Sequence, residues 1–282
     1  KCDWSSDVCS SDLWGYVSGS ANSYEWGAPG FKDEEEWATN APLEKDALDY
    51  FLHNAGSPNG PIEGGLAIFA GGNESAPQAG FPGAAEDCIS VSATAADYTP
   101  ATYTNYGPGT TIAAPGGAQD YYYEYFDDDH KRGEIGCVLS TLPYNVSESG
   151  YGYMEGTSMA CPHVSGVAAL GLSYALEKGK KFTLDEFKTM ILTSVNDMET
   201  YLDGSKTGLV LADYRKKMGT GSIDAYQLLM QVEGTPCLRA KVGTKQLVAL
   251  TKYFGGSASN LTYLRVEMTR ENMDKLGITE AP

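Results

Sequence analysis

The sequence is poor in positive charge. Its 282 residues include 20 Lys plus Arg against 37 Asp plus Glu, which gives a formal net charge of -17. A charge of this sign repels the phosphates of nucleic acids and the headgroups of anionic lipids. The chain also has no run of about 18 consecutive apolar residues, the length that a membrane-spanning helix needs. We therefore expect no nucleic-acid partner and no membrane span.

Cysteine is also scarce, at 6 residues. The four that follow residue 13 have no Cys-x-x-Cys or other metal-ligand spacing: Cys88, Cys137, Cys161 and Cys237. The sequence assigns no disulfide among them and no cofactor. Cys161 lies in an apolar helical stretch, where we expect it to act as a small buried hydrophobic residue.

The first thirteen residues, KCDWSSDVCSSDL, follow no structural pattern. They lack the hydrophobic run of a signal peptide, and Asp3 to Leu13 match the in-frame translation of a common short-read sequencing adapter. We interpret residues 1–13 as an artefact, and we expect the natural gene to continue upstream. The alternative is a natural surface arm that contains Cys2 and Cys9.

Hydrophobic spacing predicts helices around a buried sheet. The segment 14–41 is rich in Gly, Ser and Trp, contains the acidic cluster Asp33 to Glu36, and is interpreted as a surface loop. Residues 42–55 have the apolar spacing of an amphipathic helix. Short apolar runs then predict buried strands at 65–70, 88–91, 111–114 and 137–141. Helices that alternate with buried strands indicate an α/β fold with a mostly parallel central sheet.

Further elements follow the Tyr-rich acidic segment 118–135, which we interpret as a loop insertion. An apolar stripe from Ala160 to Ala175 predicts a central helix, buried nearly all round. Thr183 and Glu186 form a capping box, and Asp224 can cap a short helix through Val232. We place a domain boundary near 234–240, so that 14–235 form one domain and 236–282 begin a β-rich second domain.

The segment Gly156-Thr-Ser-Met-Ala-Cys-Pro-His-Val-Ser-Gly166 carries most of the chemical information. Pro162 must lie within the first turn or so of its helix because it cannot donate a helical hydrogen bond, so the helix starts between Thr157 and Met159. Ser158 then lies at a helix N-terminus, where unpaired N–H groups favour the negative charge of an oxyanion. On local grounds alone, Ser158 as a plain N-cap residue remains an alternative.

The segment resembles the nucleophile signature of subtilisin-like serine proteases (subtilases, peptidase family S8). Other segments match the same family in the same order, between about Trp14 and Val232: Ala70-Gly-Gly-Asn73, Phe81-Pro-Gly83, Tyr106-Gly-Pro108, Ala114-Pro-Gly116, Leu139-Ser-Thr141 and Gly221-Ser-Ile-Asp-Ala225. The resemblance implies a three-layer subtilisin-like α/β fold, incomplete here, and a peptide or protein substrate. A generic α/β-hydrolase is disfavoured because Gly156-x-Ser158-x-Ala160 lacks the second Gly of the nucleophile elbow.

The resemblance also implies roles for individual residues. Ser158 would be the nucleophile, and the Asn73 side-chain amide would hold the oxyanion together with Ser158 N. Substrate-binding roles fall on Trp14, Gly15, Ala70, Gly71, Gly72 and Met159. For Asn73, Gly71 and Gly72 the alternative is an ordinary turn, and for Met159 it is core packing.

The general base is missing from the sequence. The family order is Asp, His, Ser, yet no His-Gly-Thr and no Asp-Ser/Thr-Gly segment precedes Ser158. His163 lies about 140° around the helix from Ser158, His53 is expected on the surface of a helix, and His130 belongs to an acidic insertion. We therefore expect the catalytic Asp and His upstream, and this chain to be an inactive part of a serine endopeptidase.

Two alternatives stay open. The parent could be a pseudoprotease or peptide-binding module on the same scaffold. It could also be an acidic cation-binding protein, although Asp127 to Asp129 lack the alternating spacing of an EF-hand loop. Family habit and the acidic charge suggest a secreted or cell-surface protein, a monomer, whose signal peptide is not in this chain. The adapter-like segment suggests an assembled contig and therefore a bacterial source. The family allows structural calcium without assigning a site.

Overall fold

The computed structural model describes residues 8–10 (backbone only), 31, 33–56, 58–120, 136–206 and 208–235. Its central sheet has six strands in the order β1-β2-β3-β4-β10-β7. These are β1 (Val8–Ser10), β2 (Leu66–Ala70), β3 (Ile89–Thr94), β4 (Ile112–Pro115), β10 (Ser222–Ile223) and β7 (Val195–Asn196). Every pairing is parallel except that of β10 with β7. The predicted α/β class with a mostly parallel sheet is confirmed.

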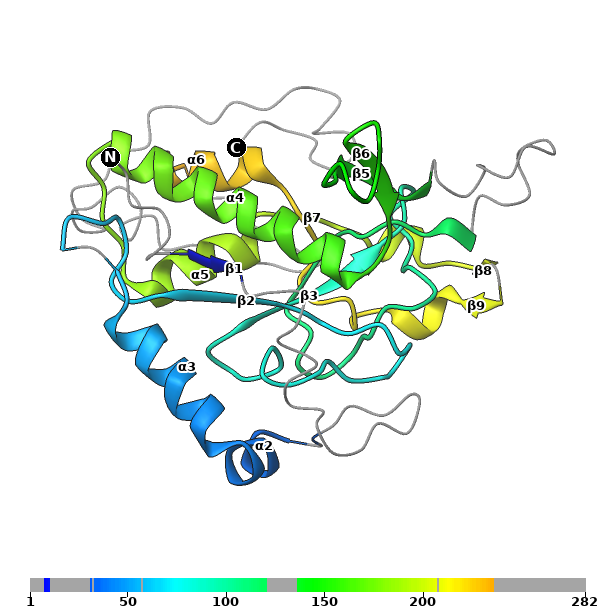
Figure 1. Cartoon of the computed structure of the whole chain (residues 1–282), viewed down its shortest axis with the longest axis horizontal. Helices are drawn as coiled ribbons and strands as arrows, with labels where there is room; N and C mark the ends of the chain where they lie inside the picture. Colours follow the sequence, from blue (N-terminus) through cyan, green and yellow to red (C-terminus); the bar gives the residue numbers. More distant parts are fainter. Residues whose placement is uncertain are drawn as a thin grey trace, which may run out of the picture. The chain divides into compact units, whose positions relative to one another are not determined.

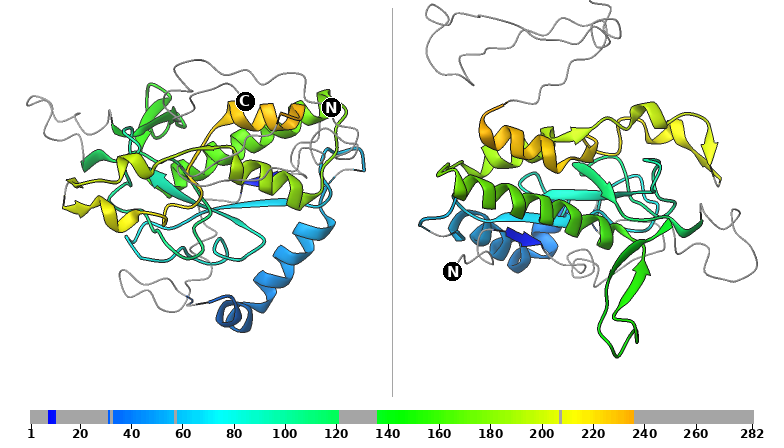
Figure 2. Two further views of the ribbon diagram at one scale, coloured as in Figure 1. Left: turned by 180° about the vertical axis from the view of Figure 1, so that it is seen from behind. Right: turned by 90° about the horizontal axis from the view of Figure 1, so that it is seen from above.

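The sheet lies between two layers of helices (Figures 1 and 2). Because successive strand residues point to opposite faces, Ile68 and Ala70 pack with α4 (Thr157–Glu177), α5 (Leu184–Thr193) and α6 (Ala225–Glu233). Ala67 and Phe69 pack on the other face with α2 (Glu34–Asn40) and α3 (Pro42–Asn54). All five residues of β2 are buried, as the continuous apolar run predicts.

Helix α4 starts at Thr157, within the predicted interval, and its stripe of Ala160, Val164, Ala168 and Ala175 is buried against the sheet. The expectation that it is buried nearly all round is wrong, because Leu170 on its outer side is 47% exposed. Small and apolar residues are also common on protein surfaces, so their presence on the outer side of α4 did not show that this side is buried. Within the described residues, α4 is also the one helix with enough length and mean hydropathy (1.3) to cross a membrane, a property that core helices of globular proteins share.

The segment around Trp37 corrects the sequence interpretation. Residues 34–40 form helix α2 where we expected a surface loop, and the Asp33 side chain caps it by accepting a hydrogen bond from Glu36 N at 2.8 Å. Acidic side chains favour the first turn of a helix, which has the positive end of the dipole. A two-turn helix with one inward-facing residue shows no apolar repeat, so the pattern was not visible in the sequence.

Trp37 is expected to contribute strongly to stability. Its side chain is fully buried, its ring stacks on Phe81 at 5.8 Å between centroids, and its Nε1 donates to Glu44 Oε2 at 3.0 Å. Trp37→Ala should lower the free energy of unfolding by about 3–5 kcal/mol, measured by urea denaturation, because it leaves a large cavity. Trp37→Phe should cost clearly less. Equal losses in the two variants would contradict this role of packing.

The predicted caps of the last two helices are confirmed. Thr183 and Glu186 form the reciprocal capping box of α5. Asp224 precedes α6, and its side chain accepts hydrogen bonds from Gln227 N at 3.0 Å and from Asn196 Nδ2 at 2.9 Å. Asp224 therefore ties α6 to the strand β7 that contains Asn196.

The Asp224 cap should give a pH-dependent stability. Burial alone would raise the pKa of Asp224, but hydrogen bonds from Gln227 and Asn196 hold that pKa below its ordinary value. Asp224→Ala should cost about 1 kcal/mol at neutral pH. A lowered pKa stabilises above the ordinary carboxyl pKa of about 3.9, and this contribution is lost as pH falls through the pKa of the folded state. Chemical denaturation from pH 7 to pH 2 measures the free energy of unfolding of the wild type, of Asp224→Ala and of the control Asp46→Ala, which changes an exposed carboxylate. The difference between the wild type and Asp224→Ala should disappear at low pH. A difference that stays constant over this range would contradict the role of Asp224 as a cap.

The strand predicted at 137–141 exists as β5 (Val138–Thr141), but it does not join the main sheet. It pairs antiparallel with β6 (Tyr151–Met154), which the sequence did not predict, in a two-stranded hairpin. Two short strands, β8 (Ser205–Lys206) and β9 (Leu209–Val210), form a second hairpin, and 3-10 helices lie at η3 (Glu199–Tyr201) and η4 (Leu211–Tyr214). Strand β6 leads directly into the turn before Ser158.

Several predictions fall on other parts of the chain. Strand β1 was not expected in residues 1–13; its backbone pairs with β2, as any extended segment can at a sheet edge. The chain divides into two compact units, Lys1–Glu233 and Gly234–Pro282. The β-rich character of 236–282, the loop at 121–135 with His130, and the residues Trp14 and Gly15 lie outside the described residues. The artefact origin of residues 1–13 stays a prediction.

Candidate active site

Two segments that are 84 residues apart in the sequence meet at one edge of the sheet. Strand β2 ends at Ala70 and continues into Gly71, Gly72 and Asn73, while α4 begins at Thr157. Ligand sites of open α/β sheets lie at the carboxyl ends of the parallel strands. Ser158 is the second residue of α4 and is half-buried. The fold therefore brings the predicted nucleophile and the predicted oxyanion donor together.

Thr157 fixes the orientation of the Asn73 side chain. Thr157 N and Thr157 Oγ1 donate hydrogen bonds to Asn73 Oδ1 at 2.8 and 2.9 Å. Thr157 Oγ1 also accepts from Gly72 N at 3.2 Å. Because Asn73 Oδ1 is held in this way, Asn73 Nδ2 points away from Thr157, and none of the described residues accepts a hydrogen bond from it.

The space beside Gly156 is bordered by two hydrogen-bond donors. A Cβ atom at Gly156 would lie 3.5 Å from Ser158 N and 3.8 Å from Asn73 Nδ2. Ser158 N belongs to the first turn of α4, where backbone N–H groups have no helical acceptor. Gly156 itself has φ 147°, which L side chains rarely adopt. The site therefore needs glycine here, and the two donor nitrogens border the same small space, which suits an oxygen atom that gains negative charge.

The turn before Ser158 is anchored by hydrogen bonds to the segment that follows β4 and to Tyr103. Gly156 N donates to Gly116 O at 3.0 Å and to the Tyr103 hydroxyl at 2.8 Å. The single proton of the same hydroxyl is shared between the carbonyl oxygens of Gly116 and Gly117, which lie 2.9 and 2.6 Å from the hydroxyl oxygen. The segment after β4 is thereby tied to the start of α4. Tyr103 was not among the predicted site residues.

Three of the predicted pocket residues lie directly before Asn73 in the chain. Ala70 is buried at the end of β2, and Gly71 and Gly72 are buried after it. The structure gives a reason for the two glycines besides substrate access: a Cβ on Gly71 would lie 3.0 Å from Val91 O, and one on Gly72 would lie 2.1 Å from Asn105 Nδ2. Met159 is half-buried beside Ser158. The substrate-binding roles of these residues stay predictions.

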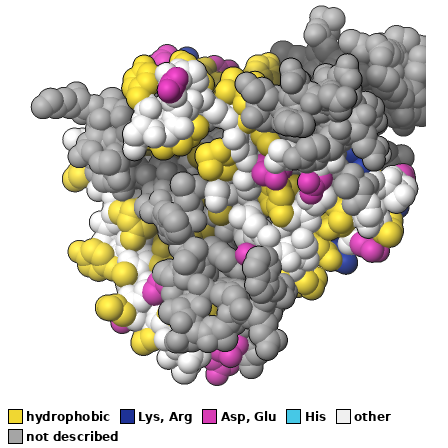
Figure 3. Space-filling view, turned by 45° about the vertical axis from the view of Figure 1, so that its right-hand side comes forward, with side chains coloured by type: hydrophobic (Ala, Val, Ile, Leu, Met, Phe, Trp, Pro, Cys, Tyr) yellow, Lys and Arg dark blue, Asp and Glu magenta, His cyan; other side chains and the backbone are white. Residues whose placement is uncertain are grey.

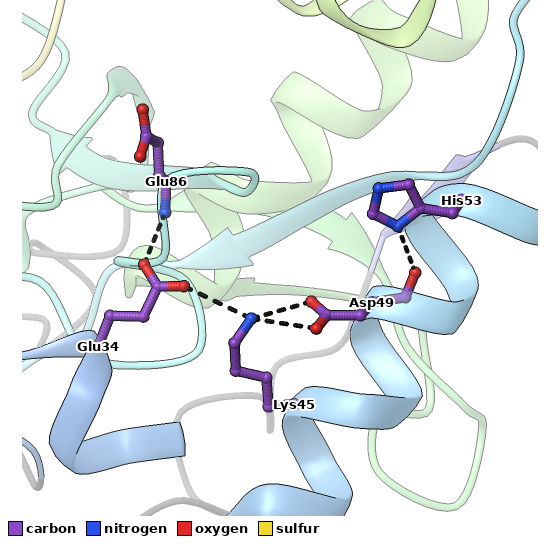
Figure 4. A network of polar contacts seen from close by, with 5 residues as sticks. All are labelled: Glu34, Lys45, Asp49, His53 and Glu86. Carbon is purple, nitrogen blue, oxygen red and sulfur yellow. Dashed lines mark hydrogen bonds and ion pairs between the residues drawn. The ribbon is translucent and has the colours of Figure 1, made fainter. Parts of the chain in front are cut away.

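Each of the two described histidines has its Nδ1 atom against a carbonyl oxygen of its own helix. His163 Nδ1 lies 2.7 Å from Met159 O on the exposed side of α4. His53 is exposed on α3, on the opposite face of the sheet, with Nδ1 2.7 Å from Asp49 O. Figure 4 shows His53 next to a network in which Lys45 binds Asp49 at 3.0 Å and Glu34 at 3.6 Å. Both placements agree with the expectation that neither ring is the base.

Two of the described cysteines, Cys88 and Cys161, are poor candidates for a nucleophile because both are buried. Cys88 is fully buried, and burial raises the pKa of its thiol to about 12, so the reactive thiolate does not form near neutral pH. Cys161 is 2% exposed, as expected of a small core residue, and its Sγ faces Ile68 O at 3.5 Å. In the described ranges there is also no group of three His, Cys, Asp or Glu side chains placed to hold a metal ion.

The acidic composition is visible on the surface. On the face shown in Figure 3, Asp and Glu side chains are more numerous than Lys and Arg side chains. Among the described residues visible on that face, the Lys and Arg side chains are few and do not form a patch.

Comparison with known proteins identifies relatives of this chain. The family model Peptidase S8, the subtilase family, matches residues 17–221. An extracellular basic protease of Dichelobacter nodosus is 33% identical over 155 residues, covering 53% of this chain and 23% of the relative. The alkaline elastase YaB of Bacillus sp. (strain YaB) is 31% identical over 156 residues, covering 55% of this chain and 34% of the relative. The matched part of the chain thus spans 23% and 34% of the length of these two relatives.

A solved structure was also found. The crystal structure of a lanthipeptide protease has a TM-score of 0.49 and 23% sequence identity, covering 71% of this chain and 58% of that chain.

Proposed function

Because the chain belongs to the subtilase family, we propose that it forms part of a serine endopeptidase that hydrolyses peptide bonds through an acyl-enzyme on Ser158. One observation carries the proposal: Ser158 N, Ser158 Cβ and Asn73 Nδ2 all border the space beside Gly156, at 3.5, 3.7 and 3.8 Å from the position that a Cβ would take there. That arrangement supports stabilisation of an oxyanion, which is usually the largest single contribution to acyl-transfer catalysis.

The proposed reaction has two halves. Ser158 Oγ attacks the carbonyl carbon of the peptide, its proton passes to a base, and the carbonyl oxygen becomes an oxyanion that accepts hydrogen bonds from Asn73 Nδ2 and Ser158 N. Collapse of this intermediate breaks the C–N bond, and the base returns the proton to the leaving amine. A water molecule then repeats the sequence on the ester and frees Ser158.

We propose that the base and its partner carboxylate lie outside the printed chain, because no His-Gly-Thr or Asp-Ser/Thr-Gly segment occurs before Ser158. The exposed position of His53 on α3, across the sheet from α4, supports this proposal. The printed chain by itself should therefore be inactive. No cofactor enters the proposed reaction, and structural calcium has no assigned site.

The names of the relatives suggest where such a protein works. One of them is described as an extracellular protease. We propose that this protein is bacterial, is secreted or held at the cell surface, acts as a monomer, and takes peptides or proteins as substrates. The negative charge supports neither nucleic acid nor an anionic membrane as a partner.

A second candidate is a pseudoprotease or peptide-binding module on the same scaffold, which the missing His and Asp segments favour. Sequencing the gene across the 5′ side of the codon for Lys1 separates the two. Asp and His motifs followed by hydrolysis of an unfolded protein by the longer product support the protease. If the motifs are absent, or if the longer product binds peptides without cleaving them, the protease proposal is wrong.

A further inference from the structure

We propose that Asn105 is a positioning residue that sets the place of Asn73, and so of the oxyanion donor. The catalytic importance of this role rests on the proposed function, whereas the support that Asn105 gives to the loop does not depend on it. Asn105 is fully buried in the segment between β3 and β4, and neither the sequence patterns nor the family resemblance singled it out.

The contacts of Asn105 bracket Asn73 on both sides. On the N-terminal side, Asn105 Nδ2 donates to Gly71 O at 3.1 Å and Asn105 N donates to Gly72 O at 3.0 Å. On the C-terminal side, Asn105 Oδ1 accepts from Glu74 N at 3.0 Å and from Ala76 N at 2.9 Å. The single residue Asn105 thus provides the hydrogen-bond partners that a neighbouring strand would otherwise give to the loop that contains Asn73.

The Asn105 side chain has no unused hydrogen-bonding capacity. An amide has two N–H donors and an oxygen with two acceptor positions. Both acceptor positions are occupied by backbone N–H groups, and the two donors go to Gly71 O and, at 2.8 Å, to Glu74 Oε2. A fully satisfied buried polar group holds its surroundings in one geometry, whereas loss of either type of contact leaves buried groups unpaired.

The glycine before Asn73 is matched to this arrangement. A Cβ on Gly72 would lie 2.1 Å from Asn105 Nδ2, and Gly72 has φ 107°. The loop therefore closes directly onto the buried amide. Thr157 holds the Asn73 side chain from α4, while Asn105, from the segment between β3 and β4, holds the backbone on either side of Asn73. An oxyanion donor has to be held to about 0.5 Å to be effective, so both supports matter.

The test uses the printed chain and needs no catalysis. The protein is labelled with ¹⁵N-asparagine, and the side-chain amide resonances of Asn73 are assigned by their loss in Asn73→Ser. Asn105→Ala removes all four side-chain contacts. Asn105→Asp keeps the two acceptor contacts but lacks both donors and faces the Glu74 carboxylate. Glu74→Ala is the milder variant in case the buried substitutions prevent folding, because it removes only the side-chain acceptor of one Asn105 donor.

The matched control is Ser92→Ala, which removes a fully buried hydroxyl in β3 that contacts Ile112 O rather than the Asn73 loop. We expect the Asn73 amide resonances to shift by more than a line width in both Asn105 variants, to shift less in Glu74→Ala, and to stay in place in Ser92→Ala. The inference is wrong if the resonances stay in place in Glu74→Ala and in every folded Asn105 variant, or if Ser92→Ala moves them as far. Because this experiment measures no reaction, its result can be interpreted even if the protein proves not to be a protease.

Discussion

Replacing Ser158 with Ala is expected to lower kcat by about 10⁶-fold in a form of the protein that contains the base, the size of loss reported for subtilisin, itself a subtilase. The loss is this large because the hydroxyl is the atom that bonds to the substrate, so no acyl-enzyme forms without it. The measurement is hydrolysis of a chromogenic peptide, together with the thermal unfolding midpoint. That midpoint should stay nearly unchanged, because Ser158 is only half-buried.

Ser165→Ala is the matched control on the same helix. Its hydroxyl is buried and donates to Cys161 O at 3.2 Å, away from the loop that contains Asn73. Ser165→Ala should retain wild-type kcat. Residual activity of Ser158→Ala within about tenfold of wild type would mean that another group is the nucleophile.

Asn73→Leu is expected to lower kcat by about 10²–10³-fold while KM changes little, the range known from the oxyanion asparagine of subtilisin. The amide of Asn73 contacts an oxygen that is charged only in the transition state, so its loss should appear in kcat rather than in binding. Steady-state kinetics with a short peptide substrate measure both constants.

Asn54→Ala serves as the control for this variant, because Asn54 is an exposed asparagine at the end of α3. It should leave both constants unchanged. The Asn73→Leu variant also leaves Thr157 N and Thr157 Oγ1 without their acceptor, so stability has to be measured beside the kinetics. A rise in KM at constant kcat would assign Asn73 to substrate binding and remove it from the oxyanion site.

Local signals in the sequence were sufficient for most elements of the fold. Pro162 located the start of α4, the Thr183 and Glu186 pair located α5, and continuous apolar runs located β2, β3 and β4. Each of these signals depends on residues that are close together in the sequence. The short helix α2 escaped because Trp37 alone carries its contact with the core.

The pairing of the strands was harder to predict from the sequence than their positions. The run 137–141 was correctly predicted as a strand, but its partner β6, with an exposed Tyr151 and Tyr153, lacks a buried face that would mark it in the sequence. The residues of both strands are exposed or half-buried, so neither strand shows an alternation of buried and exposed positions. Its place outside the main sheet follows from contacts that the sequence alone does not display.

The candidate site shows the same division. The motifs around Ser158 and Asn73 named the two groups, and the fold brings them together. The groups that hold them in place, Thr157, Tyr103 and Asn105, were missed because each acts through hydrogen bonds to residues 13 to 85 positions away. Thr157 stands beside Ser158 in the motif, so its position was a usable signal; a buried asparagine in a connecting segment offers none.

The central claim is that Ser158 is a subtilase nucleophile whose base is supplied from outside the printed chain. Its most direct test is labelling with a serine-reactive fluorophosphonate probe, applied in parallel to the printed chain and to the longer gene product, with the label mapped by mass spectrometry. We predict rapid labelling of Ser158 in the longer product, none after Ser158→Ala, and no rapid labelling of the printed chain. Rapid labelling of Ser158 in the printed chain, or labelling of the longer product at another residue, would contradict the claim.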